Sequence, residues 1–405
     1  MNIEKVSFTN KDQEQLAGRL ELPVNQRPHN FAIFAHCFTC TKNLTAVKNV
    51  SRALTAEGFG VLRFDFTGLG ESEGDFENTN FSGNVDDLIE AANFLEKNYN
   101  APTLIIGHSL GGAAAIFAAN RIPSIKAVAV INSPSSPSHV RNLLKDSTQE
   151  ITKNGKAKVN LGGIDFTIKK QFLDDLDNKS LINIVGSFKK ALLIMHSPTD
   201  RTVGIKNAED LYKAAHHPKS YISLDGVDHL LSKKEDSVYV GQVIAGWAER
   251  YISIPPVEEL KSKSKVAASL DGDEMFTTQL KLGDHNILAD EPKAYGGNNF
   301  GPSPYEFLSA GLAACTVMTI QMYARRKKWE VANVSCHIDY SKDHAVDCEH
   351  CEDDSAKIDT FTRKITLTGN LSEEQKTKLL QIADKCPVHK TLHSITQIIT
   401  TLEEL

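Results

Sequence analysis

Up to about residue 253, short apolar runs alternate with amphipathic stretches of helical periodicity, and this alternation limits the possible folds more than any other feature. The runs are rich in β-branched and aromatic residues, as strands buried on both faces of a sheet are. Strands that alternate with helices predict a doubly wound, mostly parallel α/β sheet with helices on both sides. The expected strands are Asn30–His36, Phe59–Phe64, Thr103–Gly107, Ala127–Ile131, Ala191–His196 and Tyr221–Leu224, and the clearest expected helices are Val85–Lys97 and Gly111–Asn120.

The alternation stops at Pro255 and Pro256, which end the preceding helix and lead into a run rich in lysine and serine. A chain of 405 residues exceeds the roughly 250–300 residues at which a single core divides. We therefore expect a first domain over 1–253, a linker over 254–268 and an α+β domain over 269–405. Its expected elements are strands at Met275–Leu282 and Asn286–Ala289, a long apolar helix at Pro304–Lys327, further strands, and a helix at Ser372–Lys385.

The composition is that of a globular protein, with 41% hydrophobic and 24% charged residues and a net charge of -6. No basic excess indicates a nucleic-acid partner, and no run of about 18 apolar residues indicates a membrane span. The first residues lack the apolar stretch of a signal peptide. Seven cysteines are too sparse, and odd in number, for a secreted disulfide framework, so we expect reduced thiols and a cytoplasmic location.

The segment Gly107-His-Ser-Leu-Gly111 matches the G-x-S-x-G nucleophile elbow, with an expected strand before it and a small-residue helix after it. The sharp turn needs glycine two residues before and two residues after the serine. It would place the Ser109 hydroxyl above the end of the sheet, at a helix N-terminus that stabilises negative charge. We therefore expect Ser109 to be a nucleophile.

A serine nucleophile needs a histidine base and a carboxylate that orients it. After this elbow they follow in the order acid, then histidine. Asp200 and His229 each come just after an expected strand, at the edge where α/β sheets build their sites. Asp225 and Asp228 are competing acids, but they lie too close to His229 in sequence to be the usual partner. His108 should point away from the site.

The oxyanion formed during acyl transfer needs two backbone N–H donors. One should come from Leu110, and the other from the loop after Asn30–His36, where we favour Phe38 over Cys37. With these groups Ser109 would attack an ester carbonyl, and the reaction would need neither a metal nor a cofactor.

Together these residues resemble the α/β-hydrolase esterases over about residues 1–253, in particular the feruloyl- and cinnamoyl-esterase-like and acylaminoacyl-type group. The segments that carry the resemblance are His36-Cys-Phe-Thr39, Asp65-Phe-Thr-Gly-Leu-Gly-Glu-Ser72, the elbow, Asp200 and His229. It implies a serine carboxylesterase that acts on small-molecule esters with small to medium acyl or aryl groups. Members of that group often have glycines where this chain has Cys37 and Cys40, which we interpret as small loop-packing residues rather than a disulfide or metal ligands.

The regular alternation lapses over about 134–190, which we interpret as a small cap over the site. Within it, His139–Gln149 is expected to be a helix and Val159–Lys169 a hairpin. Three cap residues are expected to line the acyl pocket: Gln171, Phe172 and Asp175.

Two cysteines of the second domain occupy positions that suggest chemistry. By its local sequence alone, Cys315 in the long helix is most simply a small buried hydrophobe. The segments Gly301–Thr319 and Lys385–Leu392, however, resemble the OsmC/Ohr family of organic hydroperoxide reductases over about residues 270–405. The resemblance implies that Cys315 attacks the peroxide and Cys386 resolves the product, with an organic hydroperoxide and a dithiol reductant as partners. It also implies an intertwined homodimer.

The same resemblance implies that Glu306 holds an arginine that lowers the thiol pKa and positions the peroxide. That arginine normally comes from an N-terminal strand, but residues 254–324 contain none. Arg325 and Arg326 would lie roughly 15 Å from Cys315 along the helix, so Arg363 or a lysine would have to replace it. The alternative is therefore a second domain that serves only dimerisation or ligand binding.

A further cluster places His344, Cys348, His350 and Cys351 within eight residues. Its C-x-x-C spacing beside histidines is compatible with zinc, but no second ligand pair of matching spacing follows. We interpret the cluster as a surface loop with incidental thiols.

Overall fold

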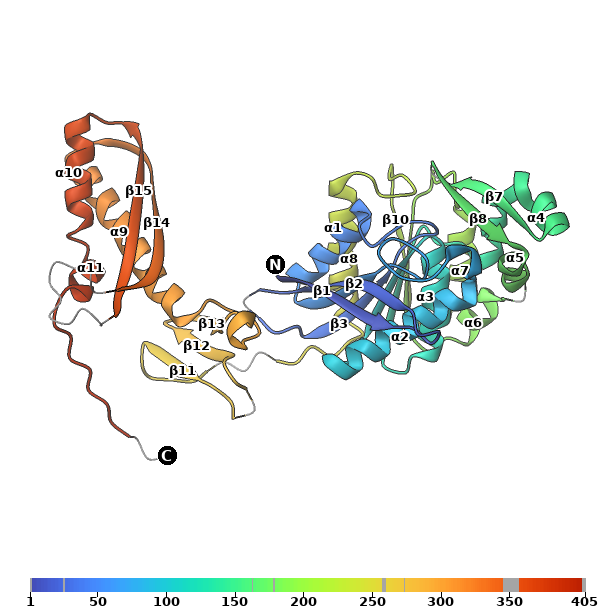
Figure 1. The fold of residues 1–405 in the computed structure, drawn as a ribbon, viewed down its shortest axis with the longest axis horizontal. Helices are drawn as coiled ribbons and strands as arrows, with labels where there is room; N and C mark the ends of the chain where they lie inside the picture. Colours follow the sequence, from blue (N-terminus) through green and yellow to red (C-terminus); the bar gives the residue numbers. More distant parts are fainter. Residues whose placement is uncertain are drawn as a thin grey trace. The chain divides into compact units, whose positions relative to one another are not determined.

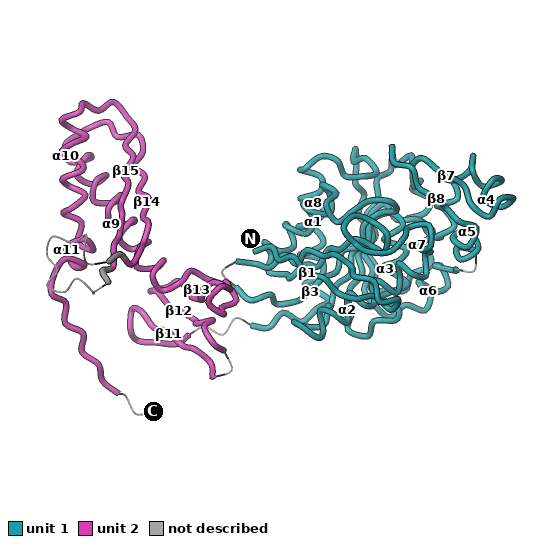
Figure 2. Tube along the Cα trace, in the orientation of Figure 1, with its two compact units in different colours: residues 1–259 teal, residues 260–405 magenta. Residues whose placement is uncertain are grey.

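The computed structural model describes residues 2–24, 26–161, 163–177, 179–256, 260–272, 274–344 and 357–402. The chain divides into two compact units, Met1–Glu259 and Leu260–Leu405 (Figure 2). Each unit has a hydrophobic core of its own.

The first unit is built on an eight-stranded sheet with the strand order β1-β2-β4-β3-β5-β6-β9-β10. The strands are β1 (Asn2–Thr9), β2 (Gln15–Leu22), β3 (Asn30–Ala35), β4 (Phe59–Phe64), β5 (Leu104–His108), β6 (Ala127–Ile131), β9 (Ala191–His196) and β10 (Lys219–Ser223). From β4 to β10 neighbouring strands are parallel, whereas β1, β2 and β4 pair antiparallel. The expected doubly wound, mostly parallel sheet is confirmed. The N-terminal hairpin is an addition that a search for apolar runs misses, because β1 alternates exposed with partly buried residues.

Helices cover both faces of this sheet (Figure 1). The helices α1 (Thr45–Ala56) and α8 (Lys234–Ala248) lie side by side on one face, α2 (Phe81–Asn98) and α3 (Leu110–Arg121) cover the other, and α7 (Lys206–Ala214) flanks β9 and β10. The buried residues Val47, Val50 and Leu54 give α1 its apolar face. Gly241 lets α8 approach α1 closely, because a Cβ at that position would lie 2.6 Å from the Cβ of Ala53.

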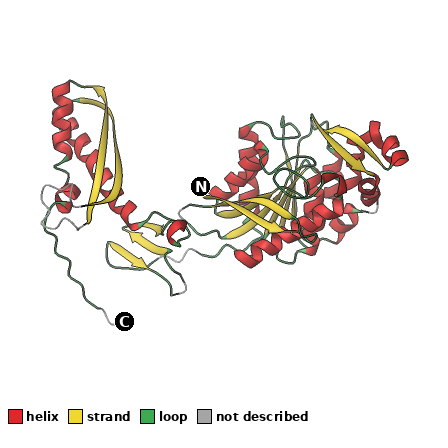
Figure 3. Cartoon of the chain, in the orientation of Figure 1, coloured by secondary structure: helices red, strands yellow, loops and turns green. Residues whose placement is uncertain are grey.

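A cap is inserted between β6 and β9 (Figure 3). It consists of the 3₁₀ helix η2 (Pro137–Ser147), α4 (Thr148–Asn154), the antiparallel hairpin β7 (Lys156–Leu161) and β8 (Ile164–Lys169), α5 (Lys170–Asp177) and α6 (Leu181–Ser187). The hairpin begins three residues before the expected one. Where a single helix is expected over His139–Gln149, the chain forms the tighter η2 and then α4; Ser136 caps η2 and Pro137 occupies its first turn, a position that proline favours.

The second unit is an α+β unit with two small sheets. It contains the antiparallel sheet of β11 (Val266–Ser269), β12 (Thr278–Leu282) and β13 (His285–Ala289), then η3 (Lys293–Tyr295), α9 (Pro304–Lys327), the long hairpin β14 (Glu330–His344) and β15 (Lys357–Asn370), α10 (Glu373–Ala383) and α11 (Pro387–Leu392). The helices α9 and α10 pack on the β14–β15 hairpin through a core formed by Ile320, Ala324, Leu379 and Ala383.

The helix α9 is apolar around most of its circumference, yet only one side of it is buried. The buried side carries Leu312, Thr316, Ile320 and Ala324, one residue per turn. On other sides Met318 and Met322 are 62% and 72% exposed. By length and composition alone, α9 could cross a membrane, since it has 24 residues and one stretch of 18 residues with a mean hydropathy of 1.4. Core helices of globular proteins meet the same criterion.

Candidate active sites

The nucleophile elbow forms at the junction of β5 and α3. Ser109 has a φ of 55° and a ψ of −127°, a conformation that L-residues rarely adopt and that is concentrated at functional sites. A Cβ on Gly107 would lie 2.3 Å from the carbonyl oxygen of Gly111, and one on Gly111 would lie 2.3 Å from that of His36. Gly107 therefore lets α3 start close to β5, and Gly111 lets it start close to the end of β3.

The structure brings Ser109, His229 and Asp200 into one chain of hydrogen bonds. His229 Nε2 lies 3.1 Å from Ser109 Oγ, and His229 Nδ1 lies 2.7 Å from Asp200 Oδ2. The other oxygen of Asp200 accepts the backbone amides of Thr202 and Val203 at 2.8 and 3.0 Å. Burial raises the pKa of the Asp200 carboxyl, but the hydrogen bonds from His229 and the two amides outweigh it and leave the pKa below its ordinary value.

The competing acids are engaged elsewhere. Asp225 accepts a hydrogen bond from the Ser223 hydroxyl, and Asp228 accepts the backbone amide of Ser232. Both stabilise the loop that carries His229 rather than its imidazole ring.

His108, which was expected to point away from the site, and Asn132, which was not singled out, both hold the backbone of His229. The carbonyl oxygen of His229 accepts hydrogen bonds from His108 Nε2 at 2.7 Å and from Asn132 Nδ2 at 3.1 Å. The opposite nitrogen of His108, Nδ1, is buried without a partner in the described part of the chain. Burial, together with the neighbouring His229, lowers the pKa of His108 to about 3, so this imidazole stays neutral and positions the base. Asn132, at the end of β6, also accepts the Ser197 amide.

The candidate oxyanion donors are the backbone amides of Phe38 and Leu110. Among the residues that the structure describes, neither amide donates a hydrogen bond. Both residues line one small pocket together with Cys37 and Gly111. Two residues with unpaired backbone amides thus border the same pocket, and one of them, Leu110, directly follows Ser109.

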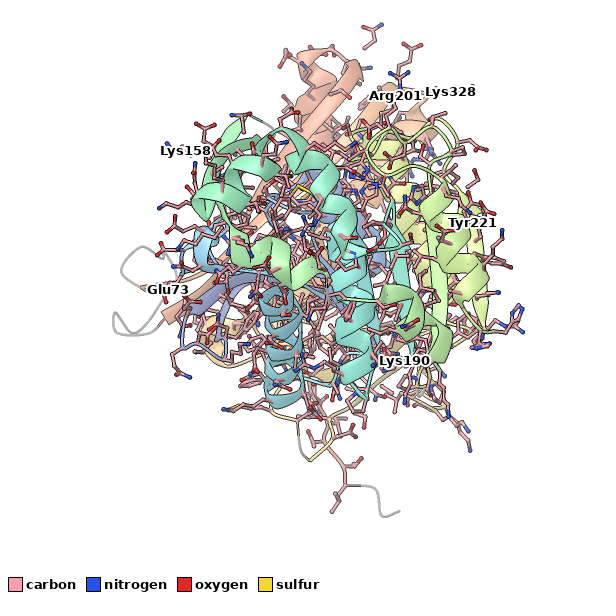
Figure 4. All side chains as sticks on the ribbon, turned by 90° about the vertical axis from the view of Figure 1, so that its right-hand side faces the viewer. Glu73, Lys158, Lys190, Arg201, Tyr221 and Lys328 are labelled. Carbon is pink, nitrogen blue, oxygen red and sulfur yellow. A yellow bond between two sulfur atoms is a disulfide. The ribbon has the colours of Figure 1, made fainter. Side chains whose placement is uncertain are left out.

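The interpretation of Cys37 and Cys40 as separate loop-packing residues is wrong. Their sulfur atoms form a disulfide, with a Cα–Cα distance of 5.4 Å (the yellow bond in Figure 4). The loop turns back on itself, as the hydrogen bond from the Cys40 amide to the Cys37 carbonyl shows, and this brings the two side chains within bonding distance. The C-x-x-C spacing was the sequence signal for it.

A buried ion-pair network anchors the far end of this loop. The Lys42 ammonium is fully buried, and it pairs with Asp65 and, at 2.9 Å, with Glu71. Arg63 donates to the Lys42 carbonyl at 2.7 Å and pairs with buried Glu21 at 2.7 Å. Each buried charge has a partner, as burial of charges requires.

Of the three cap residues expected to line the acyl pocket, only Phe172 lies near the oxyanion loop. Its ring stacks on that of Phe38 at 5.2 Å between centroids. Gln171 instead donates to the carbonyl of Asn78, and Asp175 accepts the amide and hydroxyl of Ser82. These two residues tie the cap to the rest of the unit.

His139 of η2 lies close enough to Asp200 and His229 to interact electrostatically with both. Burial lowers its pKa, so a neutral imidazole from the cap lies near the proposed catalytic residues. From the sequence, His139 was expected only to begin a cap helix, with no role near the site.

In the second unit, α9 and the segment after α10 bring Cys315 and Cys386 together. The two thiols lie within hydrogen-bonding reach of each other. Cys386 is buried and also accepts the backbone amide of His389 at 3.4 Å. Burial raises the pKa of Cys386, but the hydrogen bonds from His389, Cys315 and Thr316 outweigh it and lower the pKa overall.

Arg363 of β15, which was one candidate to replace the arginine that residues 254–324 lack, lies near these cysteines. Its Nη1 donates to Thr316 Oγ1 at 3.0 Å, next to Cys315 in sequence, and the same hydroxyl lies 4.0 Å from Cys386 Sγ. A third thiol, Cys336 of β14, interacts with both Arg363 and Cys386. Burial raises the pKa of Cys336, which disfavours its reactive thiolate form.

Glu306 does not hold Arg363 within one chain. Glu306 accepts the Ser303 amide at 2.7 Å and closes a capping box at the start of α9, whereas Arg363 pairs with Asp384. Glu306 lies nine residues before Cys315, roughly 13 Å along a helix. Of the predicted histidine and cysteine cluster, His344 is the last residue of β14, and Cys348, His350 and Cys351 lie outside the described residues.

Comparisons with known proteins agree with this division. A family model described as serine aminopeptidase, S33, matches residues 32–184, and a model of OsmC-like proteins matches residues 296–401. The esterase domain of a Rhodothermus marinus protein is 50% identical, with a TM-score of 0.53, over 62% of this chain and 99% of that one.

Two more distant matches support the same fold. The structure of ferulic acid bound to Est1E from Butyrivibrio proteoclasticus is 19% identical, with a TM-score of 0.50, over 61% of this chain and 99% of that one. The uncharacterized protein YfhR of Salmonella typhimurium is 25% identical over 56% of this chain and 74% of its own length. The chain therefore belongs to the α/β hydrolases through its first unit, which is fused to an OsmC-like domain.

Proposed function

We propose that the first unit is a serine carboxylesterase. The observation that carries the proposal is the continuous hydrogen-bonded chain from Ser109 through His229 to Asp200, beside the unpaired amides of Phe38 and Leu110. His229 takes the proton of Ser109 as the hydroxyl attacks the ester carbonyl, and Asp200 fixes the imidazole tautomer. The two amides stabilise the oxyanion, and water activated by His229 then releases the acid.

The substrates we propose are small to medium acyl or aryl esters. The rings of Phe38, Phe76 and Phe172 pack together beside the elbow, and aromatic surface of this kind favours flat, apolar groups. The ferulic acid bound to Est1E in its structure is a ligand of this class.

The test is labelling with a fluorophosphonate probe together with hydrolysis of p-nitrophenyl acetate. Wild type should label and turn over, and Ser109→Ala should lose both, with a rate loss of about 10⁴-fold or more. Ser7→Ala, at an exposed position of β1, is the matched control and should behave as wild type. Absence of labelling in wild type would refute the assignment.

For the second unit we propose a thiol peroxidase that reduces organic hydroperoxides. The Cys315 thiolate would attack the terminal peroxide oxygen, forming a sulfenic acid and releasing the alcohol. Cys386 would then displace water to form the Cys315–Cys386 disulfide, which a dithiol reductant restores. The contact between the two thiols and the nearby Arg363 guanidinium support this assignment.

Consumption of cumene hydroperoxide with a dithiol reductant tests this second activity. Cys315→Ser should abolish it and leave ester hydrolysis intact, Arg363→Met should slow it by about tenfold or more, and Cys336→Ser should leave it nearly unchanged. If wild type consumes no hydroperoxide while its esterase is intact, the unit serves dimerisation or ligand binding instead.

We also propose a homodimer formed through the second unit. A helix that is apolar on all sides is normally buried on all sides, whereas α9 leaves Met318 and Met322 exposed. A second copy of the chain, with the same apolar surface, would cover it. We propose a cytoplasmic location for this dimer.

A further inference from the structure

The disulfide in the first unit spans the residue that carries a proposed oxyanion donor. Cys37 and Cys40 flank Phe38 and Thr39 directly. The loop packs against the start of α3, where Gly111 leaves no room for a side chain beside the carbonyls of Ala35 and His36. Any movement of residues 38–39 therefore changes the position of the Phe38 amide relative to Ser109.

Both flanks of the loop are fixed without the disulfide. His36 is buried at the end of β3, and its Nδ1 donates to the Cys37 carbonyl at 2.9 Å. On the other flank Lys42 is held by its buried pair with Asp65. The ion pairs and the strand thus hold the ends of the segment but not its middle.

The Phe38 side chain is held by its packing on Phe76 and Phe172, whereas the backbone in the middle of the loop depends on the disulfide. The only backbone hydrogen bond across it, among the described residues, joins the Cys40 amide to the Cys37 carbonyl at 3.2 Å. Thr39 has a φ of 62°, which is a rare conformation for a β-branched residue, and such residues persist only where their surroundings hold them. The covalent link between Cys37 and Cys40 encloses this residue.

We propose that Cys37 and Cys40 form a redox modification site that sets the activity of the hydrolase. The disulfide holds the Phe38 amide in its donor position, and reduction to the dithiol releases it. The proposal rests on the esterase function proposed above. Disulfides in cytosolic proteins, where they occur, are usually transient and catalytic or redox-sensing, which fits a regulatory pair.

The reaction partner is a dithiol. One thiolate of the dithiol attacks the sulfur of Cys40, which is more exposed than buried Cys37; a mixed disulfide forms and Cys37 leaves as a thiolate. The second thiol of the reductant then displaces Cys40, so that the reductant departs as its own disulfide. Two electrons and two protons pass to the protein.

The experiment compares ester hydrolysis by the full chain before and after treatment with dithiothreitol. Excess reductant is removed anaerobically, because free thiols cleave nitrophenyl esters themselves. Complete loss of one oxyanion donor lowers kcat by about 10²–10³-fold. A donor that becomes mobile should lower kcat by a smaller factor. We expect kcat to fall by roughly 10- to 100-fold with little change in KM, and to recover when diamide reoxidises the pair.

Mapping of alkylated peptides reports the state of Cys37 and Cys40 in each sample. The double variant Cys37→Ala/Cys40→Ala keeps the backbone amides of Phe38 and Leu110 but cannot form the disulfide. It should therefore show the activity of the reduced protein and no response to reductant. Unchanged kcat with both cysteines shown to be reduced would overturn the proposal. Loss of circular dichroism on reduction would also overturn it, because the effect would then be unfolding. Failure of the esterase assignment can be told apart from these two outcomes, because fluorophosphonate labelling would then be absent in both the oxidised and the reduced protein.

Discussion

The two units differ in how completely they bury their apolar residues within one chain. In the first unit every residue of β3, β4, β5, β6 and β9 is buried between two layers of helices. In the described part of the second unit the buried cluster beneath α9 and α10 has four residues, and several methionines and isoleucines are more than half exposed. A parallel sheet between helices buries its apolar surface within one chain, whereas a long hairpin with two helices on it leaves apolar surface exposed.

The two candidate sites differ in the same way. In the first unit Ser109, Asp200 and His229 follow the carboxyl ends of β5, β9 and β10, at one edge of a single parallel sheet that fixes their distances. In the second unit Cys315 and Cys386 come from a helix and a helix end, and Glu306 lies far from both. We therefore expect the first site to depend on its own residues alone and the second to depend on the state of assembly.

Asp200→Asn should give the largest effect. The amide cannot hold His229 in the tautomer that accepts the Ser109 proton, so kcat for p-nitrophenyl acetate should fall about 10⁴-fold. Asp225→Asn, in the loop that carries His229, is the control and should change kcat less than twofold. If Asp200→Asn kept a tenth of the wild-type rate, the first site would not be the self-contained unit described here.

His108 should make the stability of the first unit depend on pH. Its folded-state pKa of about 3 lies below the ordinary 6.5, so its contribution is complete above pH 6.5 and is lost as the pH falls toward 3. The free energy of unfolding should drop by up to about 1.4 kcal/mol per pH unit over this range. Trp247 fluorescence in a Trp329→Phe background reports this unit alone, since the chain has two tryptophans.

His108→Gln should flatten this pH dependence, whereas His216→Gln, an exposed histidine, should leave it unchanged. Equal slopes in wild type and His108→Gln would mean that other groups govern the acid sensitivity of the first unit.

Met322→Glu should affect only the second unit. A carboxylate on the exposed side of α9 would be costly to bury in a dimer, so the dissociation constant should rise at least about tenfold, measured by sedimentation velocity. Met275→Glu is the matched control, because Met275 is also 72% exposed but precedes β12. Dimers that persist in Met322→Glu would show that α9 is not at the interface.

Glu306→Gln should give the smallest effect. A glutamine also closes a capping box, so the second unit, followed through Trp329 in a Trp247→Phe background, should lose less than about 1 kcal/mol. The hydroperoxide rate should stay within about twofold. A loss of more than tenfold would show instead that this carboxylate acts in the thiol site of an assembled dimer.

Local sequence signals predicted some of these features well and others not at all. The elbow, Asp200 and His229 are predictable because each comes shortly after a strand of the parallel sheet. The long helix is predictable because an apolar stretch of that length, without glycine or proline in its second half, favours a helix. The contacts of His108 and Asn132 were not predicted, and Arg363 was only one of several candidate cations, since each of these contacts joins residues distant in sequence. The chain forms a 3₁₀ helix and then α4 where a single helix was expected over His139–Gln149. The two helix types differ little in local sequence preference, so the sequence did not distinguish them.

The sequence by itself determined the two-part organisation, the parallel sheet and the order of the catalytic candidates, because periodicity and turn chemistry act over a few residues. Only the tertiary structure decided that Cys37 and Cys40 join, that Glu306 caps a helix and that Arg363 stands near the thiols. These outcomes depend on which side chains the fold brings within a few ångströms of each other. The spacing of residues along the sequence does not give these distances.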